Sequence, residues 1–178
     1  MAKIVDLQSF RDKALEQRSF GPWQKRFKEP FGLATRITDL SNQTVFGLSQ
    51  PGESGATAWY EFIMGVLDWG TAAKFYYLSN ADQMQVVDIH LLLADLVRFE
   101  LMRRLGWLKR LPCESERLIA LVEEFESVKQ TVRLNPPLLS ESHPDFKAYS
   151  QLAGGDREVF VRKLLGAALE AFKKQLGE

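Results

Sequence analysis

Two acids and a histidine lie in the most apolar stretch of the chain. From Val86 to Val97 every residue is apolar except Asp88, His90 and Asp95. Carboxylates and imidazoles are the side chains that bind metal ions or move protons in many enzymes. A buried acid without a chemical role needs a cationic or hydrogen-bonding partner, because an unpaired buried charge is very costly. These three side chains therefore form either a chemical site or structural contacts with other parts of the fold.

Helical geometry separates the two acids from the histidine. At about 100° per residue, Asp88 and Asp95 lie within about 20° of each other and about 10 Å apart along the helix axis. His90 points to the opposite face, so Asp88 and His90 cannot bind one metal ion from this helix alone. We expect His90 to be a core histidine with one polar partner. Arg98 follows Asp95 by three residues, a spacing that favours an ion pair within the helix.

The preceding apolar segment repeats the acidic pattern. Glu61 and Asp68 are also seven residues apart. If the two helices pack antiparallel, Glu61 approaches Asp95 while Asp68 approaches Asp88. Facing carboxylates on bundle helices form di-metal sites, and oxygen ligands suit Mg²⁺ or Mn²⁺. The four acids are therefore a candidate metal site, although the Glu-x-x-His pattern of di-iron bundles is absent and a spacing of seven is common on any helix face.

Aromatic residues are dense between positions 59 and 77. They occupy several sides of any helix there, so one core face cannot hold all of them. Packing within one large core is the simplest explanation, but an aromatic surplus is also typical of interface cores. A small apolar ligand between helices is a further alternative. The candidate interface or pocket residues are Trp59, Phe62, Trp69 and Tyr76.

The composition indicates a globular protein with a net charge of zero. Of the 178 residues 46% are hydrophobic and 26% charged, and the 23 basic residues equal the 23 acidic ones. This balance argues against a nucleic-acid partner, since dedicated nucleic-acid binders show a basic excess. The N-terminal MAKIVDLQSF lacks the apolar core of a secretion signal, and no window is long and uncharged enough to span a membrane. With the single Cys113, these features predict a cytoplasmic protein without disulfides or a membrane partner.

Two neighbouring charge blocks have opposite signs. Residues 98–110 contain five basic side chains and one acid, whereas residues 114–126 contain five acids and one basic side chain. The two blocks fit a helical hairpin with complementary faces. They also fit a homodimer, because a two-fold axis brings the basic patch of one subunit near the acidic patch of the other.

Apolar periodicity and capping residues predict an all-α fold in one domain, residues 1–178, with about six or seven helices in a bundle or orthogonal array. Gly21-Pro22 should end the first helix, and alternation over 33–48 allows a short β-hairpin or an irregular loop. The expected helices cover 6–19, 57–69, 71–78, 80–105, 114–133, 144–152 and 156–176.

The sequence indicates the function less clearly than the fold, because no catalytic motif surrounds any Ser, Cys or His. We expect a small helical binding or regulatory adaptor that acts through protein–protein contacts, as a homodimer and without a cofactor. The alternative is a metal-dependent hydrolase of a phosphorylated small molecule, in which Mg²⁺ or Mn²⁺ on the four acids polarises phosphate and activates water. No individual residue is assigned a catalytic role.

Overall fold

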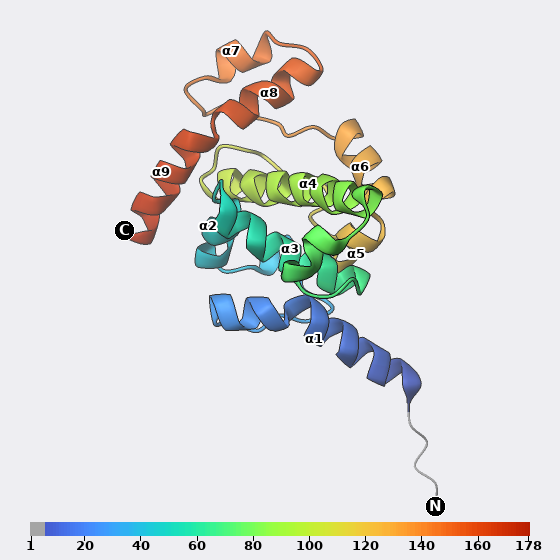
Figure 1. Cartoon of the computed structure of the whole chain (residues 1–178). Helices are drawn as coiled ribbons and strands as arrows, with labels where there is room; N and C mark the ends of the chain where they lie inside the picture. The colour runs from blue at the N-terminus through green and yellow to red at the C-terminus, as the bar shows by residue number, and fades with distance from the viewer. Residues whose placement is uncertain (1–5) are drawn as a thin grey trace, which may run out of the picture.

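A computed structural model of the chain describes residues 6–178, in which the regular elements are all helices and no sheet is formed (Figure 1). Part of the segment assessed for a secretion signal, residues 1–5, lies outside the described range. No described helix has a stretch long and apolar enough to cross a membrane. The elements are α1 (Leu7–Phe27), η1 (Ile37–Asp39), α2 (Asn42–Ser49), α3 (Glu53–Leu67), η2 (Ala72–Tyr77), α4 (Asn80–Arg104), α5 (Leu118–Glu123), α6 (Phe125–Leu134), α7 (Phe146–Ser150), α8 (Gly155–Lys163) and α9 (Leu165–Leu176).

The central element is α4, as its nearly all-round apolar character predicted. Ser79 caps it by accepting a hydrogen bond from the Asp82 N–H at 3.2 Å, and Arg103 and Arg104 occupy its last turn. It contacts α2, α3, α9 and η1, and Figure 1 shows it crossing the middle of the molecule. Both predicted boundaries of this helix are confirmed.

The predicted break at Gly21-Pro22 is wrong, because α1 continues through Pro22 to Phe27. A glycine before proline has no Cβ to collide with the proline ring, so the helix can bend there instead of ending. Figure 1 shows α1 changing direction near its middle. The bend allows α3 to pass very close, since a Cβ on Gly65 would lie only 2.3 Å from the Arg18 carbonyl oxygen.

The hairpin considered for residues 33–48, all of them described, does not form. This segment holds the 3-10 turn η1 and the helix α2 instead. Ser41 is the N-cap of α2 and accepts a hydrogen bond from the Thr44 N–H at 3.1 Å. Glu29 in turn accepts hydrogen bonds from the Ser41 N–H and hydroxyl, at 3.3 and 2.9 Å.

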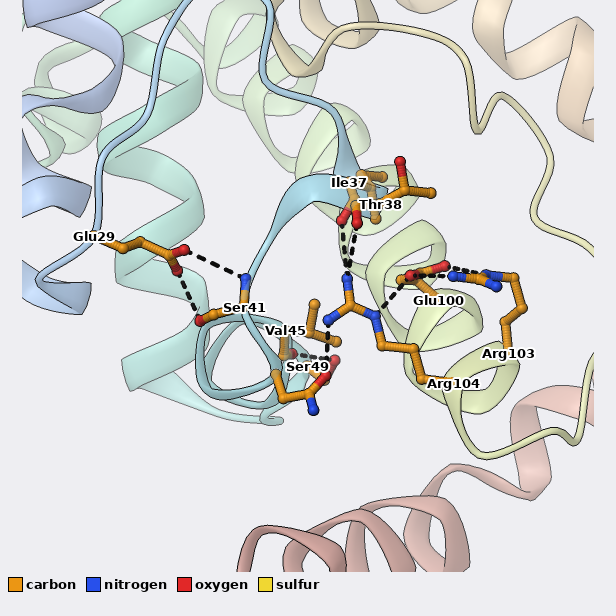
Figure 2. A network of polar contacts seen from close by, with 10 residues as sticks. Glu29, Ile37, Thr38, Ser41, Val45, Ser49, Glu100, Arg103 and Arg104 are labelled. Atoms are coloured by element: carbon orange, nitrogen blue, oxygen red, sulfur yellow. Dashed lines mark hydrogen bonds and ion pairs between the residues drawn. The ribbon is translucent and has the colours of Figure 1, made fainter.

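A buried ion cluster fastens this segment to α4 (Figure 2). The Glu100 side chain is fully buried, and its oxygens accept from Arg103 at 2.6 and 2.8 Å and from Arg104 Nε at 2.7 Å. Arg104 also donates to the Asn42 side-chain oxygen at 2.9 Å and to the Ile37 carbonyl at 3.4 Å. Arg104 thus joins α4 to η1 and to the first residue of α2.

The C-terminal helices follow the predicted apolar stripes but are divided differently. The helix predicted over 114–133 is interrupted at Glu124 and forms α5 and α6. The last predicted helix bends at Leu164, where the Leu164 N–H bonds to the Val161 carbonyl at 3.0 Å, so that α8 and α9 point in different directions. Asp156 lies in the first turn of α8 rather than at its cap, which is Gly154.

Candidate functional site

Asp88 and Asp95 share one face of α4, and this face is the floor of a groove. Four residues at helical spacing form its stripe: Met84, Asp88, Leu91 and Asp95. Met84 is 60% exposed and Leu91 is 55% exposed, although α4 is otherwise the central helix of the core. Apolar side chains that lie in a row and remain open to solvent are typical of binding surfaces.

The walls of the groove come from helices on both sides of this stripe. Near the start of α4 the wall is the α5–α6 junction, where a hollow of about 610 Å³ opens. A second hollow of about 300 Å³ continues toward Asp95, between α4, α6 and α8. The two hollows share Asp88 and Phe125, so they adjoin each other along α4. We call the pair the α4 groove, and its further lining includes Leu67, Leu92, Glu123, Glu124, Glu126, Lys129, Val132, Arg133, Glu158 and Arg162.

The end of the groove near Asp95 has internally paired charges. Arg162 on α8 contacts Asp95 and Glu158, each at 2.8 Å. Arg98 adds a weaker contact to Asp95 at 3.7 Å, which confirms the ion pair predicted within α4. Burial raises the pKa of the Asp95 carboxyl, and Arg162 and Arg98 oppose only part of that rise. Asp95 is therefore a structural acid that attaches α8 to α4.

Arg162 and Lys129 were not among the residues singled out from the sequence. Lys129 lies on α6 with its amine 5.6 Å from the centre of the Phe125 ring. Both cations come from helices that are remote from Asp95 in sequence, so no local spacing signals their approach. Phe125 and Val132 lie in the helix predicted over 114–133, and they supply the apolar part of the wall.

The four acids proposed as metal ligands do not gather at one point. Glu61 bonds to Arg26 on α1 at 3.0 Å, and Asp68 bonds to Arg18 on α1 at 3.2 Å. These two acids therefore face α1, whereas Asp88 and Asp95 face the α4 groove. Among residues 6–178 no three His, Cys, Asp or Glu side chains are grouped so that they could hold a metal ion. The Mg²⁺ or Mn²⁺ site stays a prediction without geometric support.

The four aromatic candidates have different environments. Trp59 and Phe62 are fully buried in a cluster of rings around Trp23, with ring centres 5.4 and 4.7 Å from that of Trp23. This placement makes them core residues rather than surface or pocket residues. Trp69 is half-buried, whereas Tyr76 on η2 is 84% exposed. Of the four, Tyr76 has the greatest exposure for contact with another molecule.

His90 lies on the face of α4 opposite the groove, as the helical wheel predicted. Its ring packs edge-on against Tyr60 of α3, with centres 5.3 Å apart, and Tyr60 in turn stacks on Phe75. Burial lowers the pKa of the His90 imidazole, and the charge of Arg98 lowers it further. The neutral ring is therefore favoured, which suits an aromatic packing role.

Most basic side chains of residues 98–110 form ion pairs or hydrogen bonds within the molecule. Arg103 and Arg104 bind Glu100, Arg98 donates to the Ser49 carbonyl at 3.2 Å, and Lys109 pairs with Glu141 at 2.8 Å. The block is therefore a poor match for an acidic patch on a second subunit. The homodimer stays a prediction, and its support from charge blocks is weakened.

No family model, curated protein or solved structure matches the chain. The groove has an exposed apolar floor, charged rims and helical walls, and these features suit the binding of another helix.

Proposed function

We propose that the protein is a cytoplasmic adaptor that binds an amphipathic helix of another protein in the α4 groove. The observation that supports this proposal is the exposed pair Met84 and Leu91, which line two adjoining hollows on the same face of α4. A helix laid along this stripe would cover both side chains together with Phe125. Helix-in-groove binding of this kind uses apolar anchors three, four or seven residues apart on the partner.

Leu91 should be the main apolar contact for the partner. We expect Leu91→Ser to weaken the binding of an amphipathic helical peptide about tenfold, because a half-exposed leucine gains roughly 1.4 kcal/mol when it is fully covered. The measurement is fluorescence anisotropy with two labelled peptides that have the same leucine stripe, one with lysine and one with glutamate on the polar face. Binding of either peptide supports the proposal that the protein binds an amphipathic helix.

Leu134 provides the matched control for this substitution. It lies on α6 and is 80% exposed, and it does not line either hollow of the groove. Leu134→Ser should leave peptide affinity unchanged, and both variants should keep their unfolding free energy within about 1 kcal/mol of wild type. Equal effects of the two variants on affinity, or no binding of either peptide, would contradict the proposed function.

A homodimer is a second candidate, and the first two turns of α1 favour it. Leu7 and Phe10 are 65% and 67% exposed on one face, and this part of α1 extends beyond the body of the protein (Figure 1). Most helical stability in proteins comes from packing an apolar face against another element, and these two exposed side chains offer such a face to a second copy. Asp6 and Lys13 flank the stripe on the same side, so an antiparallel second copy would place Asp6 of one arm beside Lys13 of the other.

If the protein forms this homodimer, its apparent mass in solution should rise with protein concentration, and replacing Phe10 should reduce that rise. Sedimentation velocity of wild type should show a monomer–dimer equilibrium across a concentration series, and Phe10→Ser should shift it toward monomer because the central apolar contact is lost. Val159→Ser, which changes another exposed apolar side chain on α8, is the control and should leave the equilibrium unchanged. A wild-type protein that stays monomeric at every concentration would exclude this second candidate.

A further inference from the structure

The end of the α4 groove near the start of α4 carries negative charge that the described residues do not neutralise. Asp88, Glu123, Glu124 and Glu126 line this end beside the exposed Met84, and its lining includes no Lys or Arg. None of the four acids takes part in the ion pairs of the described chain. Like charges gathered on one surface repel each other, so this arrangement lowers the stability of the fold.

Helix electrostatics explain only part of this acidic cluster. Glu126 lies in the first turn of α6, where a negative charge is favourable beside the helix N-terminus. Glu123 is the last residue of α5, where a negative charge is unfavourable. Asp88 lies in the middle of α4, far from either end. Neither an ion pair in the described chain nor a favourable position at a helix end therefore accounts for Asp88 or Glu123.

The opposite end of the groove holds cations as well as acids, because Lys129, Arg133 and Arg162 line it together with Asp95 and Glu158. Arg162 is shared between Asp95 and Glu158, and the Lys129 amine lies over the Phe125 ring. The groove is thus acidic at one end, closely balanced at the other, and apolar in between. A partner that is uniformly charged or uniformly apolar would match only part of it.

We propose that the α4 groove selects a basic amphipathic helix, whose lysine or arginine side chains contact the acidic end while its apolar stripe covers Met84 and Leu91. This inference rests on the proposed function and names the chemistry of the partner. From Met84 to Asp95 the floor is about 16 Å long, which corresponds to about three turns of bound helix. Contact with cations neutralises Asp88 and Glu123, and so removes a repulsion that the unbound protein retains.

The two matched peptides test this selectivity on the full-length protein. Because their leucine stripes are identical, a difference in affinity reports only the charge of the polar face. We expect the lysine peptide to bind about tenfold or more tightly than the glutamate peptide at low salt, and the ratio to fall as salt rises to about 0.5 M, where exposed charges are screened. Equal affinities, or tighter binding of the glutamate peptide, would overturn the inference.

Two double variants test whether the acidic end of the groove causes the preference for the lysine peptide. Glu123→Gln with Glu126→Gln should weaken the lysine peptide about threefold to tenfold and leave the glutamate peptide no weaker. The control, Glu170→Gln with Glu178→Gln, removes two exposed acids at the C-terminal helix and should leave both affinities unchanged. Equal losses in the two double variants would assign the preference to overall charge and overturn the inference.

These experiments distinguish failure of the inference from failure of the proposed function. If both peptides bind equally and Leu91→Ser weakens both, the groove binds helices but does not select basic ones, and only the inference fails. If neither peptide binds, the proposed function fails together with the inference. If the lysine peptide alone binds and Leu91→Ser has no effect, the binding is electrostatic and lies outside the groove, so both fail.

Discussion

Gly65→Ala should lower the free energy of unfolding by about 3 kcal/mol, one of the largest effects expected for a single substitution in this chain. The added Cβ would lie 2.3 Å from the Arg18 carbonyl oxygen and 2.7 Å from the Arg18 carbonyl carbon. Both are backbone atoms of α1, so no side-chain rotation can relieve the collision and the two helices must separate. Urea unfolding followed by circular dichroism measures the change.

Gly166 is the matched control for this prediction. It is also a helical glycine, but a Cβ there meets nothing within 4 Å. Gly166→Ala should raise the unfolding free energy by about 0.5 to 1 kcal/mol, because alanine is the better helix former and restricts the unfolded chain. A Gly65→Ala variant as stable as wild type would contradict the close crossing of α1 and α3.

Glu100→Leu should lower the unfolding free energy by about 3 to 5 kcal/mol, the range for removing one partner of a buried ion pair. The fully buried carboxylate receives hydrogen bonds from Arg103 and Arg104, as Figure 2 shows. Leucine would leave the Arg104 guanidinium, whose side chain is only 15% exposed, without its carboxylate. The same urea titration measures this loss.

Glu141→Leu is the control, because it also removes one carboxylate partner of a basic side chain. The Glu141 side chain is 72% exposed in its pair with Lys109, so its removal should change stability by less than about 1 kcal/mol. If Glu100→Leu has an effect as small as that of Glu141→Leu, the Glu100 cluster does not stabilise the attachment of η1 and α2 to α4.

Features encoded by neighbouring residues were predictable from the sequence. The start of α4 is an example, because Ser79 and the acid in the first turn are a local capping signal. The C-terminus of α9 is another, because Gly177 takes the left-handed conformation that closes a helix. In the helix predicted over 114–133, the apolar residues at helical spacing are buried even though the helix is interrupted at Glu124, namely Leu118, Leu121, Val122, Phe125, Val128 and Val132.

Features that depend on distant contacts were missed. Ser41 is a helix cap with Glu29 as its partner, twelve residues away, and alternation in the segment suggested a strand instead. Gly21-Pro22 usually interrupts a helix, but here the burial of Trp23 and the close passage of Gly65 accompany a bend. In both segments tertiary packing decided between local structures that the sequence alone left open.

The candidate site was predictable only in part. The shared face of Asp88 and Asp95 followed from helical spacing, but their neighbours did not. Arg162 reaches Asp95 from a helix more than sixty residues further along the chain, and Glu61 turns toward Arg26 on α1. The metal hypothesis assumed that the acidic faces of α3 and α4 meet, whereas α1 pairs with the acids of α3.

Methyl chemical shifts test the central claim, that a partner helix binds in the α4 groove, most directly. The protein would be labelled at methionine and leucine methyl groups, assigned, and titrated with the lysine peptide. We predict that the largest shifts occur at Met84, Leu91 and Leu92, while Leu7 on α1 and Leu134 on α6 stay unchanged. Shifts concentrated at Leu7 or Leu134, with Met84 and Leu91 unaffected, would contradict the account.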